Sequence, residues 1–176
     1  DENGFIQSVV ETEAGRCILL DTALLAPEAG EHWGEFCELR ARWLQARLAE
    51  TGDKPVYLFM HHPAFDISLP SLDNIRLRDE RPLAGVIAGA KNIRHMFFGH
   101  VHRPVFGSWL GVPFSILKGT NHQVAFDLET VVPVPKSHEP PAYGVVYLSD
   151  SAVVVHSHDY LDRSALPVPA NARKIA

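Results

Sequence analysis

Four histidines and a glycine, in two short stretches, are the residues of this chain best suited to chemistry. The stretch "FMHHPAF" holds His61 and His62, and "FFGHVHRPVFG" holds Gly99, His100 and His102. Imidazoles that converge without a nearby cysteine favour Zn, Mn, Fe or Ni over Ca. Two metal ions about 3.5 to 4 Å apart can share such a set, as in many hydrolytic centres. A hydrolytic dinuclear metal centre is therefore one interpretation of the pattern.

Each histidine pair follows an apolar run that is typical of a strand buried on both faces. "PVYLFM" leads into His61, and "IRHMFFG" leads into His100. The intervening stretch "DERPLAGVIAGA" has helical spacing, with Pro82 suited to the first turn. Strand, helix and strand predict a parallel βαβ unit, and ligands bind where the carboxyl ends of such strands emerge. We therefore expect both pairs at one edge of one sheet.

The spacing of His100 and His102 suggests that both face the same pocket. In an extended segment, residues two apart point to the same side, so Val101 turns away into apolar packing. Gly99 permits the sharp bend that a site at a strand end requires.

The remaining patterns predict a single α/β domain over residues 1–160 and a loosely ordered tail over 161–176. "GFIQSVVE" and "RCILLDT" read as two neighbouring strands, and residues 32–50 as an amphipathic helix carrying Trp33, Phe36 and Trp43. After Gly107 the chain reads as short strands joined by turns, with a proline-rich loop at 133–141.

The composition of the chain argues against nucleic acid and membranes as binding partners. The formal net charge of −5, with lysine and arginine scattered among acids, gives no basic footprint for nucleic acid or an anionic membrane. No apolar run approaches the roughly 18 residues that span a bilayer. Cys17 and Cys37 are too few for a disulfide framework and fit a reducing compartment. We expect a cytoplasmic protein with a small-molecule substrate.

The motifs resemble those of the calcineurin-like metallophosphoesterases, in particular the branch of class III cyclic-nucleotide phosphodiesterases and glycerophosphodiesterases. "FMHHPAF", "FFGHVHRPVFG" and the earlier "CILLDT" carry the resemblance, which runs from about Gly4 to about Tyr160. It implies a four-layer α/β/β/α sandwich, of which this chain is the C-terminal part. It also implies metal-dependent hydrolysis of small phosphodiesters, either cyclic nucleotides or glycerophosphodiesters.

The resemblance also assigns roles to the histidines. His61 and His100 are expected to bind one divalent ion and His102 a second, the ions being Mn, Fe, Zn or similar. A metal-activated hydroxide is then expected to attack phosphorus in line with the leaving alkoxide. His62 becomes the catalytic candidate, either facing the substrate or orienting its neighbour.

The chain also departs from the family pattern. An Asp-x-His, a Gly-Asp-x-x-Asp and a Gly-Asn-His element precede these motifs in the family, and none occurs in this sequence. Together with the start at Asp1, this predicts the C-terminal half of a longer enzyme. We expect the chain alone to be inactive and to need an N-terminal segment.

Three alternatives stay open at this point. A metallophosphoesterase-like fragment without catalysis would serve as an interaction module. A homo-oligomer, formed through the strand-rich C-terminal part, stays open as well. A mononuclear zinc hydrolase would use His61, His100 and His102 with one open position. Asn121 or His122 in "GTNHQ" would approach a phosphate, although a simple turn explains that stretch better. His156 and His158 repeat the two-residue spacing within an alternating strand and read as an outer polar face.

Overall fold

One six-stranded mixed sheet organises the chain. The computed structural model describes residues 1 and 3–164, with strand order β1-β2-β3-β4-β6-β5 in the main sheet. Its strands are β1 (Ser8–Thr12), β2 (Gly15–Leu19), β3 (Val56–Met60), β4 (Ile93–Phe98), β5 (Val105–Trp109) and β6 (Val112–Ile116). The helices are α1 (Glu38–Thr51), α2 (Pro70–Asp73) and α3 (Arg81–Gly89). Two small sheets pair β7 (Gln123–Val124) with β8 (Lys136–Ser137) and β9 (Tyr143–Leu148) with β10 (Val153–His158).

The predicted βαβ unit is confirmed as β3, α3 and β4. The centre of the sheet is parallel, with β2 beside β3, β3 beside β4, and β4 beside β6. Leu58 and Met96 face each other across this centre and are fully buried, as continuous apolar runs predict. The flanking strands β1 and β5 each close an antiparallel hairpin onto the parallel core.

The helix expected over residues 32–50 begins later than its apolar spacing predicted. Helix α1 starts at Glu38, and Cys37 before it has an extended backbone. Gly34 instead lies beside Leu77 in an isolated parallel bridge, and its amide donates to the carbonyl of Arg76. Backbone pairing with a distant loop therefore holds residues 33–36 out of the helix.

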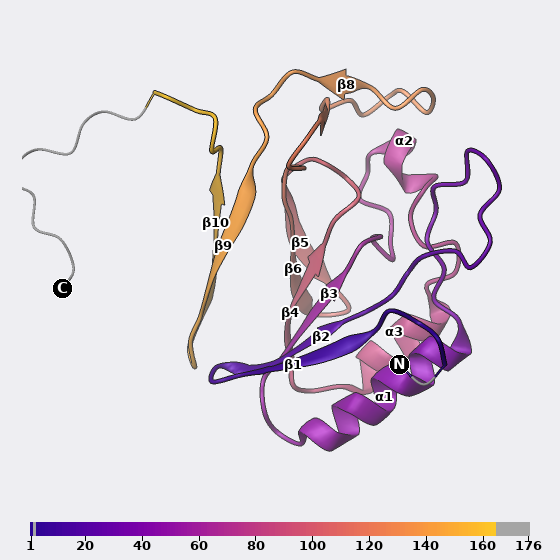
Figure 1. Cartoon of the computed structure of the whole chain (residues 1–176), viewed down its shortest axis with the longest axis vertical. Helices are drawn as coiled ribbons and strands as arrows, with labels where there is room; N and C mark the ends of the chain where they lie inside the picture. Colours follow the sequence, from indigo (N-terminus) through magenta and orange to yellow (C-terminus); the bar gives the residue numbers. More distant parts are fainter. Residues whose placement is uncertain (2, 165–176) are drawn as a thin grey trace, which may run out of the picture.

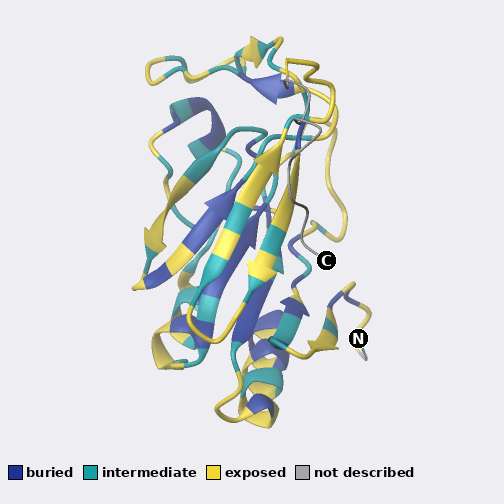
Figure 2. Ribbon diagram, turned by 90° about the vertical axis from the view of Figure 1, so that its left-hand side faces the viewer, coloured by how far each residue is buried: buried dark blue, intermediate teal, exposed yellow. Residues whose placement is uncertain are grey.

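The elements form three layers. Helices α1 and α3 cover one face of the main sheet, and the β9–β10 hairpin lies over the other (Figure 1). Seen from the hairpin side, the strands behind it are mostly buried and the hairpin itself is largely exposed (Figure 2). The structure thus confirms the α/β class. Of the tail expected over 161–176, residues 165–176 lie outside the described part.

No helix among the described residues combines the length and the apolar character that a membrane crossing requires.

Gly15, at the start of β2, packs closely against the backbone of Pro55, and this contact gives a testable prediction about stability. Its φ is +140°, and a Cβ there would overlap the carbonyl oxygen of Pro55. We expect Gly15→Ala to lower the free energy of unfolding by about 2–4 kcal/mol, because backbone strain and the clash add. Chemical denaturation measures this.

Gly111→Ala is the matched control for that change. Gly111 also has a positive φ, +82°, but an added Cβ meets nothing within 4 Å. It should lose only the strain contribution, about 1 kcal/mol. Equal losses at the two positions would contradict a clash with Pro55.

Candidate metal centre

Two adjacent parallel strands deliver the histidine pairs to one edge of the sheet. Met60 at the end of β3 lies opposite Phe98 at the end of β4, so His61 and Gly99 emerge together. The Gly99 amide donates to the carbonyls of Met60 (3.2 Å) and His61 (3.0 Å). These bonds tie the two strand ends to each other.

Three imidazoles form the tightest cluster of potential ligands. One ring nitrogen from each of His61, His62 and His100 lies within 4.8 Å of the others. His100 Nδ1 and His61 Nε2 are 3.1 Å apart. Two imidazoles bound to one tetrahedral metal at about 2.0–2.1 Å place their nitrogens about 3.3 Å apart. The His61–His100 pair therefore has the spacing of two ligands of one ion.

His100 carries a second indication of a missing partner. Its Nε2 is buried and makes no hydrogen bond to any described residue. A buried polar atom without a partner costs free energy, and native structures seldom keep one without a reason. The neutral imidazoles fit a divalent cation that His61 would bind through Nε2 and His100 through Nδ1, with the partnerless Nε2 of His100 then carrying the ring hydrogen.

His102 lies outside the three-histidine cluster, but it lines the same surface hollow as His61 and His100. Its Nδ1 donates to the carbonyl of His122 at 2.8 Å, and the two rings lie 4.2 Å apart. Because Nδ1 carries the hydrogen, Nε2 keeps its lone pair, which is the usual arrangement of a metal-binding histidine. A cavity of about 360 Å³ is lined by His61, Gly99, His100, His102, Leu117, Lys118, Gly119, Thr120, Asn121 and His122.

The backbone that presents His100 and His102 is not extended, contrary to the expectation from their spacing. Both residues adopt left-handed conformations, with φ of 66° and 53°. Val101 between them is fully buried, as expected. Left-handed backbone at non-glycine residues is uncommon and concentrates at functional sites. A tight bend, rather than a strand, directs both rings to the same hollow.

Burial and mutual proximity keep these imidazoles neutral. Desolvation, followed by the neighbouring His61, lowers the pKa of His62 to about 4. Desolvation, followed by His62 and His61, lowers the pKa of His100 to about 3. The pKa of His61 is also lowered, chiefly by burial. At neutral pH each ring therefore offers a lone pair.

These shifts predict an acid-sensitive fold for the metal-free chain. Folding lowers the pKa of His62 from 6.5 to about 4 and the pKa of His100 from 6.5 to about 3. Below pH 6.5 the unfolded chain therefore binds more protons than the folded chain does, and acid favours unfolding. Their contribution to stability is complete at neutral pH and is lost as pH falls below 6.5. From pH 7 to pH 5 we expect a loss of about 2 kcal/mol, allowing for partial exposure of the rings.

Urea unfolding at several pH values measures this dependence. His100→Gln removes one titrating group and should flatten the pH profile. His156→Gln, at an exposed strand position, should leave the profile unchanged. A profile in His100→Gln as steep as that of the wild type would contradict the assignment.

Sequence reasoning missed three residues that the fold brings to this cluster. The hydroxyl of Thr22 is 2.8 Å from His62 Nδ1, and both residues are buried. The Gly34 backbone packs against the His62 ring, so closely that a Cβ would lie 2.5 Å from Nδ1. His32 lies near enough that its positive charge would lower the pKa of His100. Among these, only Thr22 lay in a recognised motif, "CILLDT".

Other predicted positions lie where their patterns suggested. His156 and His158 are exposed on β10, as expected of an outer face. Asn121 and His122 follow β6 and line the hollow beside His102. Cys17 and Cys37 are both free and partly buried.

Comparison with known proteins places this geometry in context. No protein-family model matches the sequence. A probable cyclic nucleotide phosphodiesterase of Rhodopseudomonas palustris is 42% identical over 162 residues, which are 92% of this chain and 58% of that protein. A probable glycerophosphodiester phosphodiesterase, GpdQ, of Arcobacter nitrofigilis is 29% identical over 96% of this chain and 61% of its own length. The chain thus spans about three fifths of these relatives.

The fold has a counterpart among solved structures. A dimetal phosphatase from Danio rerio superposes with a TM-score of 0.63 over 89% of this chain and 58% of that one, at 15% identity. Fold likeness, the relatives and the histidine motifs at the ends of β3 and β4 agree. These findings support the calcineurin-like metallophosphoesterase family as the family of this chain.

Proposed function

We propose that this chain supplies three histidine ligands to a dinuclear centre that hydrolyses small phosphodiesters, of the cyclic-nucleotide or glycerophosphodiester type. The observation that carries the proposal is the 3.1 Å approach of His61 Nε2 and His100 Nδ1. The relatives named as cyclic nucleotide and glycerophosphodiester phosphodiesterases support the substrate class.

The residues divide the work as follows. His61 and His100 hold one divalent ion (Mn, Fe or Zn), and His102 holds the second through Nε2. Bound ions of this kind polarise a phosphoryl oxygen and lower the pKa of water. His62 is buried, is held by Thr22 and is not among the residues that line the hollow, which favours a role in orienting its neighbours over direct contact with the substrate. Lys118 lines the same hollow, with its ammonium paired to Asp159 at 3.1 Å and to Glu139 at 3.4 Å.

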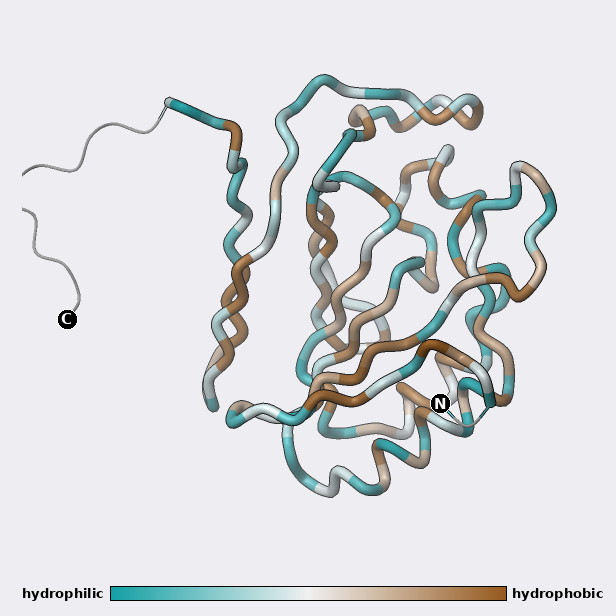
Figure 3. The backbone as a smooth tube through the Cα atoms, in the orientation of Figure 1, coloured by the Kyte–Doolittle hydropathy of each residue, from teal (hydrophilic) through white to brown (hydrophobic). Residues whose placement is uncertain are grey.

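The proposal requires a further polypeptide segment on the N-terminal side. The cluster among described residues holds only imidazoles, whereas a dinuclear hydrolytic centre also uses carboxylates. The β9–β10 hairpin offers a surface for such a segment, because Tyr143, Val145 and Tyr147 alternate along β9 and remain 45%, 38% and 64% exposed. Hydrophobic stretches run along this otherwise uncovered hairpin (Figure 3).

We place the complete enzyme in the cytoplasm.

A mononuclear hydrolase is the second candidate. The sequence suggested His61, His100 and His102 for it, whereas the structure groups His62, in place of His102, with His61 and His100. Three imidazoles and an open position make a catalytic zinc site. It predicts one metal per chain and turnover without any added segment.

Complementation separates the two candidates. We would assay Mn²⁺-dependent hydrolysis of bis(4-nitrophenyl) phosphate by the 176-residue chain alone, and again with the N-terminal part of the Rhodopseudomonas palustris relative, quantifying bound metal in both samples. The dinuclear proposal predicts turnover only in the second sample, lost in His100→Ala and retained in His156→Ala. Turnover by the chain alone with one metal would support the mononuclear site. Silence in both samples would leave a non-catalytic interaction module.

A further inference from the structure

A network of polar contacts away from the hollow fixes the orientation of His62. The Thr22 hydroxyl meets His62 Nδ1 at 2.8 Å, in a position where Thr22 is 2% exposed. Thr22 itself lies in no helix or strand, just beyond the end of β2. Its position therefore depends on what anchors the loop around it.

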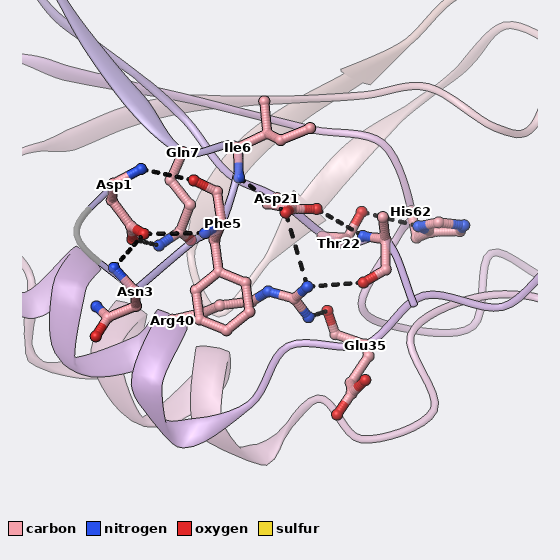
Figure 4. A network of polar contacts seen from close by, with 11 residues as sticks. Asp1, Asn3, Phe5, Ile6, Gln7, Asp21, Thr22, Glu35, Arg40 and His62 are labelled. Atoms are coloured by element: carbon pink, nitrogen blue, oxygen red, sulfur yellow. Dashed lines mark hydrogen bonds and ion pairs between the residues drawn. The ribbon is translucent and has the colours of Figure 1, made fainter. Parts of the chain in front are cut away.

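Arg40, in the first turn of α1, is that anchor. Its guanidinium donates to the carbonyl of Ala23 and to the carbonyl of Glu35, both at 2.7 Å. Ala23 follows Thr22 directly, and the Glu35 amide donates to the carbonyl of Thr22 at 3.0 Å. One side chain thus clamps the two backbone segments that lie on either side of Thr22 (Figure 4).

The guanidinium of Arg40 is buried and lies next to a carboxylate and an aromatic ring. Arg40 is 1% exposed, with Asp21 Oδ2 at 3.7 Å and the ring of Phe5 at 4.3 Å from its guanidinium carbon. The carboxylate of Asp21 accepts in turn from the amides of Ile6 and Ala23. A planar guanidinium can serve two carbonyls and a carboxylate at once, whereas an ammonium cannot match that geometry. Burying a charged side chain costs free energy, and one use of a buried ionic group is to specify a single conformation.

We propose that Arg40 is a positioning residue for the metal centre. It holds Asp21, Thr22 and Ala23 in the register at which the Thr22 hydroxyl meets His62 Nδ1. A hydroxyl can donate or accept, but among the described residues this buried hydroxyl has no other acceptor, so it donates to Nδ1 and leaves the ring hydrogen on Nε2. Arg40 thereby selects one tautomer and one ring orientation of His62 beside His61 and His100. The consequence for metal binding rests on the proposed function, but the tautomer does not.

The test reads the tautomer of His62 in the metal-free chain. A single tautomer gives two well-separated ring ¹⁵N shifts in long-range ¹H–¹⁵N spectra of histidine-labelled protein, and a mixture brings them together. We expect separated shifts in the wild type and in Thr22→Ser, which keeps the hydroxyl. In Thr22→Val and Arg40→Met the shifts should converge, although Met preserves much of the apolar stem.

Controls on the same helix distinguish positioning from stability. Arg42 is exposed two residues further along α1, and Arg42→Met should leave the His62 shifts as in the wild type. Should Arg40→Met fail to fold, Arg40→Lys decides, since it keeps the charge beside Asp21 but cannot serve Ala23 and Glu35 together. Converged shifts in Arg40→Lys support the proposal. Wild-type shifts in a folded Arg40→Met, or in Arg40→Lys where Met does not fold, overturn it.

Metal titration of the same variants separates this inference from the function. If the centre is as proposed, Arg40→Met should weaken Mn²⁺ binding about 10-fold, as the loss of a residue supporting a ligand does. A wild-type chain that binds no metal, with the tautomer changes as expected, would overturn the function and leave the role of Arg40 standing. An unchanged His62 tautomer in the variants, together with metal binding by the wild-type chain, would overturn the role of Arg40 and leave the proposed function standing.

Discussion

His100→Ala is expected to weaken the binding of Mn²⁺ or Zn²⁺ by more than about 100-fold, because losing even a residue that supports a ligand costs about 10–100-fold. Removing this ring takes away His100 Nδ1, 3.1 Å from His61 Nε2, and leaves His61 without the neighbour that makes a chelating pair. Isothermal titration with either metal measures the loss. His156→Ala, which removes an exposed imidazole on β10, should bind as the wild type does.

A second measurement on the same variant makes the prediction specific to metal. His100 Nε2 is buried without a partner, so the metal-free fold bears the cost of desolvating it. Thermal unfolding of metal-free His100→Ala should therefore show little or no loss of stability, and added metal should no longer stabilise it. A large loss of stability without metal, with metal affinity unchanged, would mean that His100 serves the fold and not a cation.

The sequence predicted the placement of the histidine pairs because that placement follows from local patterns. Continuous apolar runs before His61 and His100 identify two buried strands, and the helix between them makes those strands parallel and adjacent. The meeting of His61 with His100 needs no more information than this. The bend at Gly99–His102 could not be predicted in the same way. Both histidines have a left-handed backbone conformation, which is strained and which no residue propensity favours for histidine.

The support of His62 lay beyond the reach of local patterns. Thr22 and His62 are 40 positions apart, and nothing in their sequence surroundings links them. Gly34 lay within the helix expected over residues 32–50, yet its backbone closes on the His62 ring because Gly34 pairs with Leu77. The same pairing delayed the start of α1 relative to its apolar spacing. Tertiary contacts of this kind override helical periodicity and can be seen only in the folded chain.

Gly34→Ala is expected to have the second large effect. A Cβ at this position would lie 2.5 Å from Nδ1 and 2.6 Å from Cγ of His62. The Gly34 backbone cannot withdraw, because its amide donates to Arg76 and its carbonyl accepts from the Arg78 amide. The ring of His62 must move instead, which breaks its contact with Thr22 and leaves a buried hydroxyl unpaired. Overpacking and the unpaired group together should lower the free energy of unfolding by about 2–4 kcal/mol.

Two comparisons tie that loss to His62. Gly85→Ala makes the same chemical change within α3, where an added Cβ meets nothing within 4 Å, and should stabilise the chain by about 0.5–1 kcal/mol. In a His62→Ala background, Gly34→Ala should cost less than in the wild type, since Nδ1 and Cγ are gone and only Cβ of residue 62, 2.8 Å away, remains. Residues in direct contact show such coupling, whereas independent sites add. A cost of Gly34→Ala that is the same with and without His62 would place the clash elsewhere and remove the argument that this glycine shapes the metal centre.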